Sequence, residues 1–367
     1  MQIKAAVARE KGQKLSLENL QIDEPRENEV LVRIVAAGIC HTDLSVRDQH
    51  VPVPLPVVLG HEGSGIVEKI GSRVTKVKPG DKVVLSLGSD GECEKCKAGL
   101  PSYCEHHNEY NFAGSRLDGS VSLHHHDEDI HSHFFSQSSF ATYSIADESG
   151  VVKVEDDAPI EYLGPFACGI MTGAGSIMNT LRPEPGTSIV VFGAGAVGLS
   201  AIMAAKVVGC TTIIAVDLKE NRLELAKNVG ATHVINPSKE NMVERVKELT
   251  NGKGAHYAFE STGIPHVMSD SFDILAENGS SYITGVTPLG TKLDLDIWGL
   301  IKGRSIRGGV MGDAVPSTFI PRLVELFQQG RFPVDKMMRF YRLDEINQAI
   351  EDVESGTTVK AVLRMDK

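Results

Sequence analysis

The sequence has few cysteines, few aromatic residues and no excess of positive charge. Six cysteines in 367 residues are too few for a disulfide scaffold, and no apolar run near the start resembles a signal peptide, so we expect a reducing, cytoplasmic setting. The 37 Lys and Arg residues are outnumbered by 48 Asp and Glu residues. The net charge of −11 argues against nucleic acid or an anionic membrane surface as the main partner. Aromatic residues make up only 5%, which argues against a platform for stacking bases.

Two uncharged stretches raise the question of a membrane span. They cover residues 163–181 and 185–205 and are long enough to cross a bilayer. Glycines interrupt both, and the second stretch contains the strand-like run Ile189–Phe192 followed by a glycine-rich turn. Because this order is typical of a buried strand, a turn and a buried helix, we predict no membrane span.

The pattern of the sequence changes about halfway along the chain. Short β-type runs such as residues 30–35 alternate with turns in the first part, which is typical of an irregular β-rich domain. Strand-like and helix-like runs then alternate, which predicts a parallel, doubly wound sheet. The strand-like runs are 189–192, 212–216, 233–235, 256–259 and 282–284, and helix-like runs cover 218–229 and 242–249. We predict a β-rich catalytic domain in residues 1–168, completed by residues 309–367, with a nucleotide-binding domain in residues 169–308 between them.

A glycine-rich motif follows the first strand of the predicted nucleotide-binding domain. Its G-x-G-x-x-G pattern is formed by Gly193, Gly195, Ala196, Val197 and Gly198. The first glycine permits the turn, the second lets the backbone approach a pyrophosphate, and the third lets the helix pack on the strand. Asp217 ends the next strand, where its carboxylate would bind the adenosine ribose and repel a 2′-phosphate. The motif predicts an NAD site, and the alternative is a packing turn with a solvated aspartate.

Cys40, His61 and Cys168 form the first candidate metal site. About 20 residues separate Cys40 from His61, and Cys168 lies at the edge of the nucleotide-binding domain. Two thiolates and one imidazole leave the fourth position of a tetrahedral zinc ion open, as a catalytic zinc requires. From the residues alone, the alternative is that all three have structural roles, since cysteine is among the most buried residue types.

A second candidate metal site is confined to one loop. Asp90, Cys93, Cys96 and Cys104 together suit a closed, structural zinc site with four ligands. The aspartate is a harder donor than a thiolate, which would weaken the site. A redox-active Cys-x-x-Cys pair is the competing interpretation. Cys210, the remaining cysteine, is predicted to be a buried packing residue.

Taken together, these motifs resemble the zinc-dependent medium-chain alcohol dehydrogenases over essentially the whole chain. The motifs are Gly38–Asp43, Gly60–Gly65, the loop from Asp90 to Cys104, Cys168–Gly173 and the turn from Gly193 to Gly198. Within the family, the chain is most similar to the aryl- or benzyl-alcohol dehydrogenase branch through residues 54–59, 133–141 and 163–165. The resemblance implies a Rossmann-type sheet inserted into a GroES-like catalytic domain. It also implies a homodimer or homotetramer, in which residues 280–310 extend the sheet between subunits.

The resemblance also assigns roles at the catalytic zinc. Cys40, His61 and Cys168 would be its ligands. Glu62 would lie close enough to exchange with a ligand, and Asp43 would orient His61. Many relatives have a cysteine at the position of Asp90 in the second, structural zinc site.

Proton transfer and cofactor binding follow from the same resemblance. Thr42 would accept the proton of the alcohol. Ser45 stands where liver-type relatives have a relay histidine, so the proton would leave through water or His41. Further cofactor contacts are expected at His41, Thr172, Arg222, Gly285, Val286 and Lys360.

The activity implied by the resemblance is the reversible, zinc- and NAD-dependent oxidation of primary aromatic or allylic alcohols to aldehydes. The expected partner is therefore a small alcohol or aldehyde. Candidate pocket residues are Leu55, Phe112, Phe134, Phe135 and Trp298. The alternatives are a polyol, short-chain alcohol or glutathione-adduct dehydrogenase and, more distantly, a non-catalytic scaffold that binds zinc and nucleotide. Seven of the 13 histidines lie between His106 and His133, which indicates either an active-site cover or metal site, or a solvated insertion.

Overall fold

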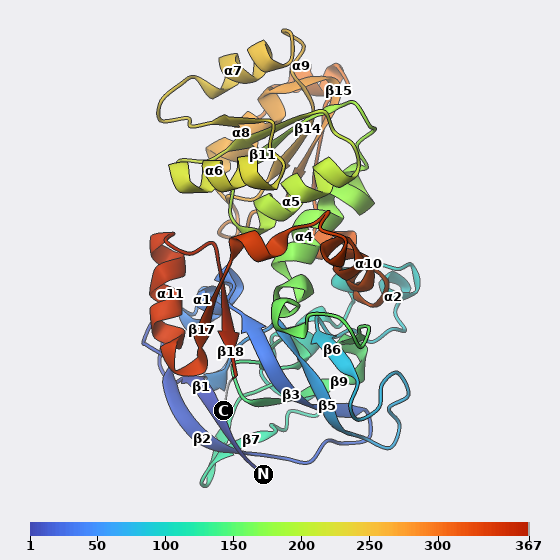
Figure 1. The fold of residues 1–367 in the computed structure, drawn as a ribbon, viewed down its shortest axis with the longest axis vertical. Coiled ribbons are helices and arrows are strands. Elements are labelled where there is room, and N and C mark those ends of the chain that lie inside the picture. Colours follow the sequence, from blue (N-terminus) through green and yellow to red (C-terminus); the bar gives the residue numbers. More distant parts are fainter. Residues whose placement is uncertain (366–367) are drawn as a thin grey trace. The chain divides into compact units, whose positions relative to one another are not determined.

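The computed structural model describes residues 1–365, and its elements fall into two compact units (Figure 1). Unit 1 contains Met1–Cys168, Val315–Glu325 and the chain from Met338 onward, and unit 2 contains Gly169–Ala314 and Leu326–Met337. The sequence pattern predicts that all of residues 309–367 belong to the first domain. Residues 309–314 and Leu326–Met337 group instead with unit 2.

The reason for this difference is visible at the short 3-10 helix Val334–Met337. It packs against helix α6 (Glu220–Val229), and Lys336 donates a hydrogen bond to the carbonyl of Asn228 at 3.3 Å. A polar, exposed contact of this kind leaves no periodic signal in the sequence.

Unit 1 is built on two mainly antiparallel sheets. The first has the order β4-β1-β2-β7-β8, with strands Gln2–Ala8 (β1), Ser16–Ile22 (β2), Val57–Val58 (β4), Leu123–His125 (β7) and Glu128–Ile130 (β8). The second has the order β10-β6-β5-β3-β18-β17, with strands Glu29–Gly38 (β3), Gly63–Ile70 (β5), Lys82–Leu85 (β6), Val151–Lys153 (β10), Met338–Arg342 (β17) and Lys360–Arg364 (β18). A further strand, Tyr143–Asp147 (β9), also pairs with β3.

Helices are few in unit 1. They are His41–Arg47 (α1), Glu94–Lys97 (α2), His107–Asn111 (α3) and Ile346–Ser355 (α11), while Pro316–Gln328 (α10) begins in unit 1 and ends in unit 2.

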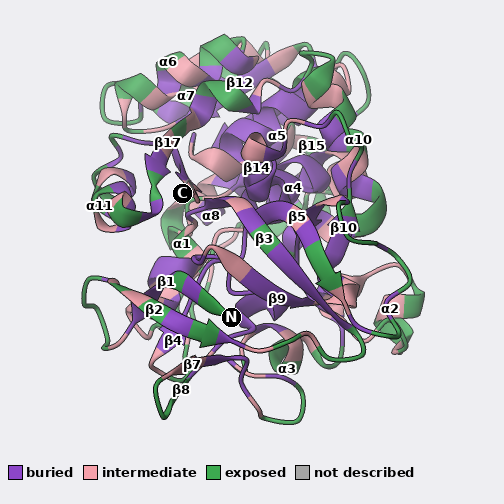
Figure 2. Ribbon diagram, turned by 60° about the horizontal axis from the view of Figure 1, so that its bottom comes forward, coloured by how far each residue is buried: buried purple, intermediate pink, exposed green. Residues whose placement is uncertain are grey.

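Strand β3 is the centre of the second sheet. It is rich in Val, Ile and Ala, and eight of its ten residues are buried (Figure 2), as expected of a strand covered on both faces. It pairs with β5 so that Ala37 faces Gly63. The chain segments just after β3 and just before β5 therefore lie next to each other, and both carry candidate metal ligands.

Unit 2 contains a six-stranded parallel sheet, which confirms the predicted Rossmann-type fold. Its order is β13-β12-β11-β14-β15-β16, with strands Ser188–Phe192 (β11), Thr212–Val216 (β12), His233–Ile235 (β13), Ala255–Glu260 (β14), Leu275–Ile283 (β15) and Ser305–Gly308 (β16). Its helices are Gly169–Gly175 (α4), Ala196–Val207 (α5), Glu220–Val229 (α6), Met242–Leu249 (α7), Pro265–Asp273 (α8) and Ile297–Ile301 (α9). In Figure 2, α6 and α7 carry exposed residues on their outer sides, whereas β14 is mostly buried.

The two uncharged stretches belong to the interior of this fold. The first forms α4 together with a short 3-10 helix before it (Gly164–Ala167) and a π-helical turn after it (Ser176–Leu181), and the second contains β11 and most of α5. Within residues 1–365, no helix combines the length and the apolar character that a bilayer crossing would need.

A buried ion pair anchors the start of β3. Arg116 donates from Nε to Glu29 Oε1 at 2.6 Å and from Nη2 to Oε2 at 3.2 Å, and both residues are less than 10% exposed. Burial alone would raise the pKa of Glu29. Hydrogen bonds from His133, from Arg116 and from the backbone N–H of Arg26 outweigh burial and lower this pKa to about 2.

This pKa predicts a specific sensitivity to acid. Because the folded-state pKa of Glu29 lies below its ordinary value of 4.5, its contribution to stability is complete above pH 4.5 and is lost as the pH falls towards 2. The full shift corresponds to about 3 kcal/mol. Glu29→Gln should therefore flatten the loss of unfolding free energy between pH 4.5 and 2, measured by urea titration. Glu24→Gln, at an exposed pair with Lys69, is the control; equal pH profiles for Glu29→Gln and the wild type would refute the prediction.

Candidate active site and cofactor site

Four potential metal ligands come together in unit 1. One ligand atom from each of Cys40, His61, Glu62 and Cys168 lies within 4.8 Å of the others. Cys40 follows β3, and His61 and Glu62 directly precede β5, whose register with β3 places the two segments side by side. The backbone N–H of Gly38 donates to the carbonyl of Glu62 at 3.0 Å, which joins them further. The structure thus brings together all three predicted ligands and the predicted exchange residue.

His61 is held so that one ring nitrogen faces the cluster without a partner. Its Nδ1 lies 2.9 Å from Asp43 Oδ1, and both side chains are almost fully buried. Its Nε2 is buried and has no hydrogen-bond partner among the described residues. A carboxylate that binds Nδ1–H directs the lone pair of Nε2 towards a metal, and leaving such an atom without a partner is otherwise costly. The residues therefore fit a zinc ion bound by Cys40, His61 and Cys168.

Asp43 also organises the backbone around this cluster. Its Oδ2 accepts a hydrogen bond from the N–H of Cys40 at 2.9 Å, which caps the start of α1, and its Oδ1 accepts from the N–H of Gly60 at 3.1 Å. One buried carboxylate therefore fixes both segments that carry ligands, in addition to the imidazole of His61.

The two cysteines of the cluster differ in acidity. A hydrogen bond from Cys168 lowers the pKa of Cys40, against the effect of burial and with help from His61. The same interaction with Cys40, together with burial, raises the pKa of Cys168. The two thiols therefore interact directly, and a coordinating cation deprotonates a thiol outright.

Lys360 and Glu62 form a buried ion pair beside the ligands. Lys360 Nζ lies 2.5 Å from Glu62 Oε2 and donates to the carbonyl of Ile39 at 3.0 Å. Burial raises the pKa of Glu62 to about 7, although the charge of Lys360 opposes this shift. A side chain at Gly38 would collide with the carboxylate of Glu62, so this position requires glycine. Lys360 is also an expected cofactor contact; here it is 2% exposed and bonded to Glu62 and Ile39 within unit 1, and its contact with the cofactor stays a prediction.

The residues of the expected proton path surround the start of α1. Thr42 is half-buried, and its Oγ1 lies 3.8 Å from Cys40 Sγ. Ser45 is also half-buried, one turn further along the helix, and His41 is exposed. Thr42 is therefore the hydroxyl that lies beside the ligands.

Aromatic rings pack against the imidazole of His61. The ring centroid of Phe135 lies 4.6 Å from that of His61, and the ring of Phe134 lies 5.5 Å away in a T-shaped arrangement. Phe112 contacts both phenylalanines. Of the other expected pocket residues, Leu55 is half-buried in unit 1 and Trp298 is 61% exposed on α9 of unit 2.

The second cluster is preformed in the loop around α2. Ligand atoms of Asp90, Cys93, Cys96 and Cys104 lie within 4.8 Å of one another. Backbone N–H groups of Cys93 and Glu92 donate to Asp90 Oδ1 and keep the pKa of this carboxyl low. All six cysteines are free thiols. The donor set of three thiols and one carboxylate fits a closed, four-coordinate zinc ion.

In unit 2 the glycine-rich motif forms the turn between β11 and α5. Gly193 has φ +89°, a conformation that favours glycine, and a side chain at Gly198 would collide with the carbonyl of Gly193. Gly195 is the N-terminal cap of α5, with Ala196 and Val197 in the first turn, so backbone N–H groups are available there for an anion.

Asp217 lies beside the glycine-rich turn. Its Oδ2 accepts from the N–H of Ala194 at 2.8 Å, and its Oδ1 accepts from the N–H of Lys219 at 2.9 Å. Arg222 Nη1 is 3.9 Å from Oδ2, and Arg222 Nε is buried without a hydrogen-bond partner in the described structure. The carboxylate is thus fixed beside the glycine-rich turn by two backbone N–H groups, and its contact with the ribose stays a prediction.

The structure also reveals a residue that the sequence analysis missed. Glu260 ends β14, and its Oε1 accepts hydrogen bonds from Thr262 N, Thr262 Oγ1 and Gly263 N. Its Oε2 lies so close to Gly285 that a side chain there would not fit. Glu260 therefore shapes the ends of β14 and β15, and its only signal in the sequence is an acidic residue directly after an apolar run.

The remaining expected cofactor contacts differ in exposure. Val286, directly after Gly285, is 87% exposed. Thr172 is buried in α4, with its Oγ1 3.7 Å from Met311 Sδ.

Comparisons with known proteins agree with this site. The alcohol dehydrogenase GroES-like domain matches residues 26–156, and the zinc-binding dehydrogenase domain matches residues 196–329. Geraniol dehydrogenase of Castellaniella defragrans is 43% identical over 366 residues, which cover 98% of this chain and 96% of that protein. The crystal structure of benzyl alcohol dehydrogenase from Acinetobacter calcoaceticus superimposes with a TM-score of 0.96 at 49% identity, with both chains fully covered. A zinc-binding-domain alcohol dehydrogenase from Burkholderia ambifaria has a TM-score of 0.98 at 50% identity, again over both whole chains.

The chain belongs to the zinc-binding alcohol dehydrogenase family. The predicted class, an alcohol oxidoreductase that uses zinc and a nicotinamide dinucleotide, is thereby confirmed.

Proposed function

We propose that this enzyme oxidises primary alcohols whose carbinol carbon adjoins an aromatic ring or an alkene, with NAD as the hydride acceptor. The observation that carries the proposal is the cluster of Cys40, His61 and Cys168, in which the unpartnered Nε2 of His61 lies beside phenylalanine rings. The names of the geraniol and benzyl alcohol dehydrogenases, which act on an allylic and an aromatic alcohol, support the same substrate class.

The residues of unit 1 would prepare the reacting alcohol. Zinc, when bound, supplies positive charge that stabilises the developing charge on the alcohol oxygen, and the nicotinamide accepts the hydride. Asp43 keeps His61 in the tautomer that binds metal through Nε2. Thr42, beside Cys40, accepts the proton of the alcohol, and Phe134 and Phe135 exclude water from that side of His61.

Unit 2 would hold the cofactor. The N-terminus of α5 at Gly195 binds the pyrophosphate, and Asp217 binds the ribose hydroxyls and rejects a 2′-phosphate. In unit 1, Asp90 and its three cysteines would bind a structural zinc ion, which requires the thiols to stay reduced and thus favours a cytoplasmic location.

A homodimer or homotetramer is part of the same proposal. Large apolar side chains of unit 2 are more than 60% exposed at Val286, Leu289, Ile297, Trp298 and Ile301. Strand β16 is an edge strand of the parallel sheet. Exposed apolar patches and free strand edges mark surfaces where a second chain pairs, so we assign the subunit contact to this part of unit 2.

A substrate panel tests the proposal directly. NADH formation is measured at 340 nm with benzyl alcohol, cinnamyl alcohol, geraniol, ethanol and sorbitol. We expect kcat/KM for the first three to exceed that for ethanol by about 100-fold, because an apolar pocket gains about 1–3 kcal/mol for each well-fitted group. A higher kcat/KM for sorbitol or ethanol would instead identify a polyol or short-chain alcohol dehydrogenase.

A further inference from the structure

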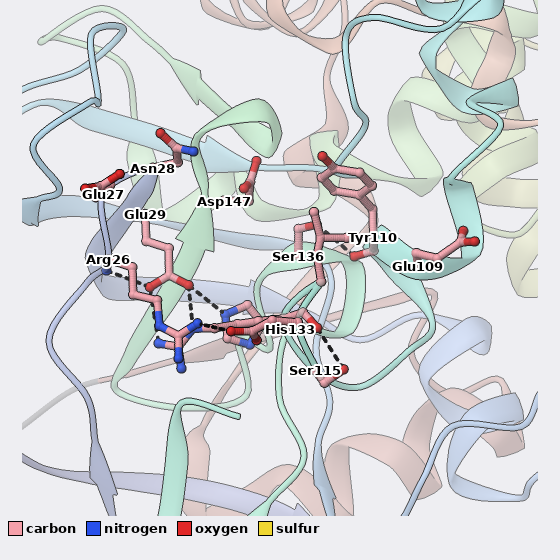
Figure 3. Close-up of a pocket in the computed structure, with 13 residues that line it drawn as sticks. Arg26, Glu27, Asn28, Glu29, Glu109, Tyr110, Ser115, His133, Ser136 and Asp147 are labelled. Carbon is pink, nitrogen blue, oxygen red and sulfur yellow. Dashed lines mark hydrogen bonds and ion pairs between the residues drawn. The ribbon is translucent and has the colours of Figure 1, made fainter. Parts of the chain in front are cut away.

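A cavity of about 550 Å³ in unit 1 lies outside the metal-ligand cluster. It is lined by residues that include Glu29, Arg116, His133 and Ser136, and by none of the four clustered ligands (Figure 3). Glu29, Arg116 and His133 are only 7%, 8% and 5% exposed. Three ionisable side chains are thus buried together with no role in the chemistry described so far.

These three residues form a polar clamp. Arg116 donates hydrogen bonds to both carboxylate oxygens of Glu29, and the N–H of Arg26 donates to Glu29 Oε2 at 2.8 Å. His133 Nε2 lies 3.5 Å from Glu29 Oε1, while its Nδ1 lies 2.8 Å from Ser132 Oγ. The imidazole of His133 therefore lies between the hydroxyl of Ser132, within hydrogen-bond distance of Nδ1, and the Glu29 carboxylate, which is near Nε2 and is itself fixed at both oxygens.

His133 begins a segment with unusual backbone geometry. His133, Phe135, Ser136 and Ser138 have φ values of +61°, +53°, +56° and +67°. Each non-glycine residue in this region costs about 1 kcal/mol or more. Such conformations persist only where the surroundings fix them, so residues 133–138 depend on the contacts that hold their side chains.

The same segment ends against the metal ligand. Phe134 and Phe135 pack on the ring of His61, at 5.5 and 4.6 Å between centroids. Gln137 Nε2 donates to the carbonyl of His61 at 3.1 Å. A shift of the backbone at His133 would therefore be transmitted to the rings beside His61.

We infer that the clamp of Glu29, Arg116 and His133 positions the Phe134–Phe135 pair beside His61, and that it thereby sets the preference for aromatic over small aliphatic alcohols. The inference rests on the proposed function, because the alcohol must bind beside the His61 imidazole on which the buried rings of Phe134 and Phe135 pack. Glu29, Arg116 and His133 are positioning residues, since they act through the phenylalanines. Arg116 is the residue to replace in a test, because a lysine cannot reproduce the bidentate hydrogen bonding of arginine to a carboxylate.

The test compares Arg116→Lys with Arg9→Lys. Arg9 also contacts both carboxylate oxygens of one glutamate, Glu18, but it does not touch residues 133–138. In Arg116→Lys, kcat/KM for benzyl alcohol should fall about tenfold relative to that for propan-1-ol, as expected for a misfitted apolar group. Amide hydrogen exchange in peptides covering 133–138 should become faster, and bound zinc should be unchanged. Arg9→Lys should leave the selectivity and this exchange at wild-type values.

The other outcomes are equally decisive. Unchanged selectivity, or an equal loss for both alcohols that follows the fall in Tm, would overturn the inference. If Arg116→Lys does not fold, His133→Asn takes its place, because asparagine tolerates the left-handed backbone but is too short to reach Glu29. If the wild type oxidises neither alcohol, the proposed function fails. Amide hydrogen exchange of residues 133–138 in Arg116→Lys then decides by itself whether the clamp positions this segment.

Discussion

Replacing Cys40 by serine should lower kcat for benzyl alcohol by about 10³-fold and remove one zinc ion per chain. One ligand atom of Cys40 lies within 4.8 Å of those of His61 and Cys168. Serine is nearly isosteric but is a poor ligand for zinc, since its hydroxyl stays protonated. A metal contributes several kcal/mol by stabilising charge on a reacting oxygen, and about 4 kcal/mol corresponds to 10³-fold in rate. The loss should therefore exceed that caused by replacing Cys210, the one cysteine outside the two clusters.

Cys210→Ser provides the matched control. Cys210 is also a buried free thiol, and its Sγ lies 3.9 Å from Thr187 Oγ1. Its replacement should leave kcat within about twofold and the zinc content unchanged. Zinc is measured by elemental analysis of the dialysed protein, and the fold by thermal unfolding. A Cys40→Ser enzyme that lost zinc but kept more than a tenth of its kcat would rule out a catalytic role for this cluster.

Strong local patterns made most of the unit 2 fold predictable. The strand-like run at Ile189–Phe192, the glycines after it and the apolar helix beyond correspond to β11, the turn and α5. Strand β15 begins seven residues before its predicted start at Tyr282. Its first half, Leu275–Gly279, does not look like a strand in the sequence, because it contains polar residues and an asparagine with a left-handed backbone. Strand β16 was not predicted, since Ser305–Gly308 is short and has no alternating pattern.

The metal ligands of the candidate site could be predicted from their residue types, but the buried ion pair beside them could not. Cysteine and histidine are recognisable as ligands wherever they occur, so Cys40, His61 and Cys168 could be grouped before their distances were known. The pairing of Lys360 with Glu62 joins residues about 300 positions apart through the antiparallel contact of β18 with β3. Lys360 is the first residue of an ordinary strand pattern, β18, and no local signal distinguishes it from a surface lysine.

In the histidine-rich region, too, the local sequence does not reveal the environment of each side chain. His124 and His125 lie on the β7–β8 hairpin and contact carboxylates such as Asp129 and Glu18. His133, only a few residues away, is buried against Glu29. The composition alone could not separate these environments, because burial of His133 depends on a glutamate from β3, about 100 residues earlier.

Replacing Asp217 by asparagine should shift the cofactor preference from NAD towards NADP by about 100-fold or more in the ratio of kcat/KM values. A hydrogen bond from a ribose hydroxyl to a charged group contributes about 1.5–3 kcal/mol, which is lost with the charge. The same change removes the repulsion of a 2′-phosphate. Asparagine still offers an oxygen to the N–H of Ala194, so the glycine-rich turn should be preserved.

Arg222 should strengthen this shift. Its guanidinium lies 3.9 Å from Asp217, and its Nε has no hydrogen-bond partner among residues 1–365, so loss of the carboxylate leaves it free for a phosphate. The measurement is kcat/KM for NAD and NADP at a saturating concentration of benzyl alcohol. Glu224→Gln removes an equal charge from the exposed face of α6 and should leave the ratio unchanged. If both variants shifted the ratio equally, general surface charge would account for the preference; if neither did, Asp217 would not be the residue that selects NAD.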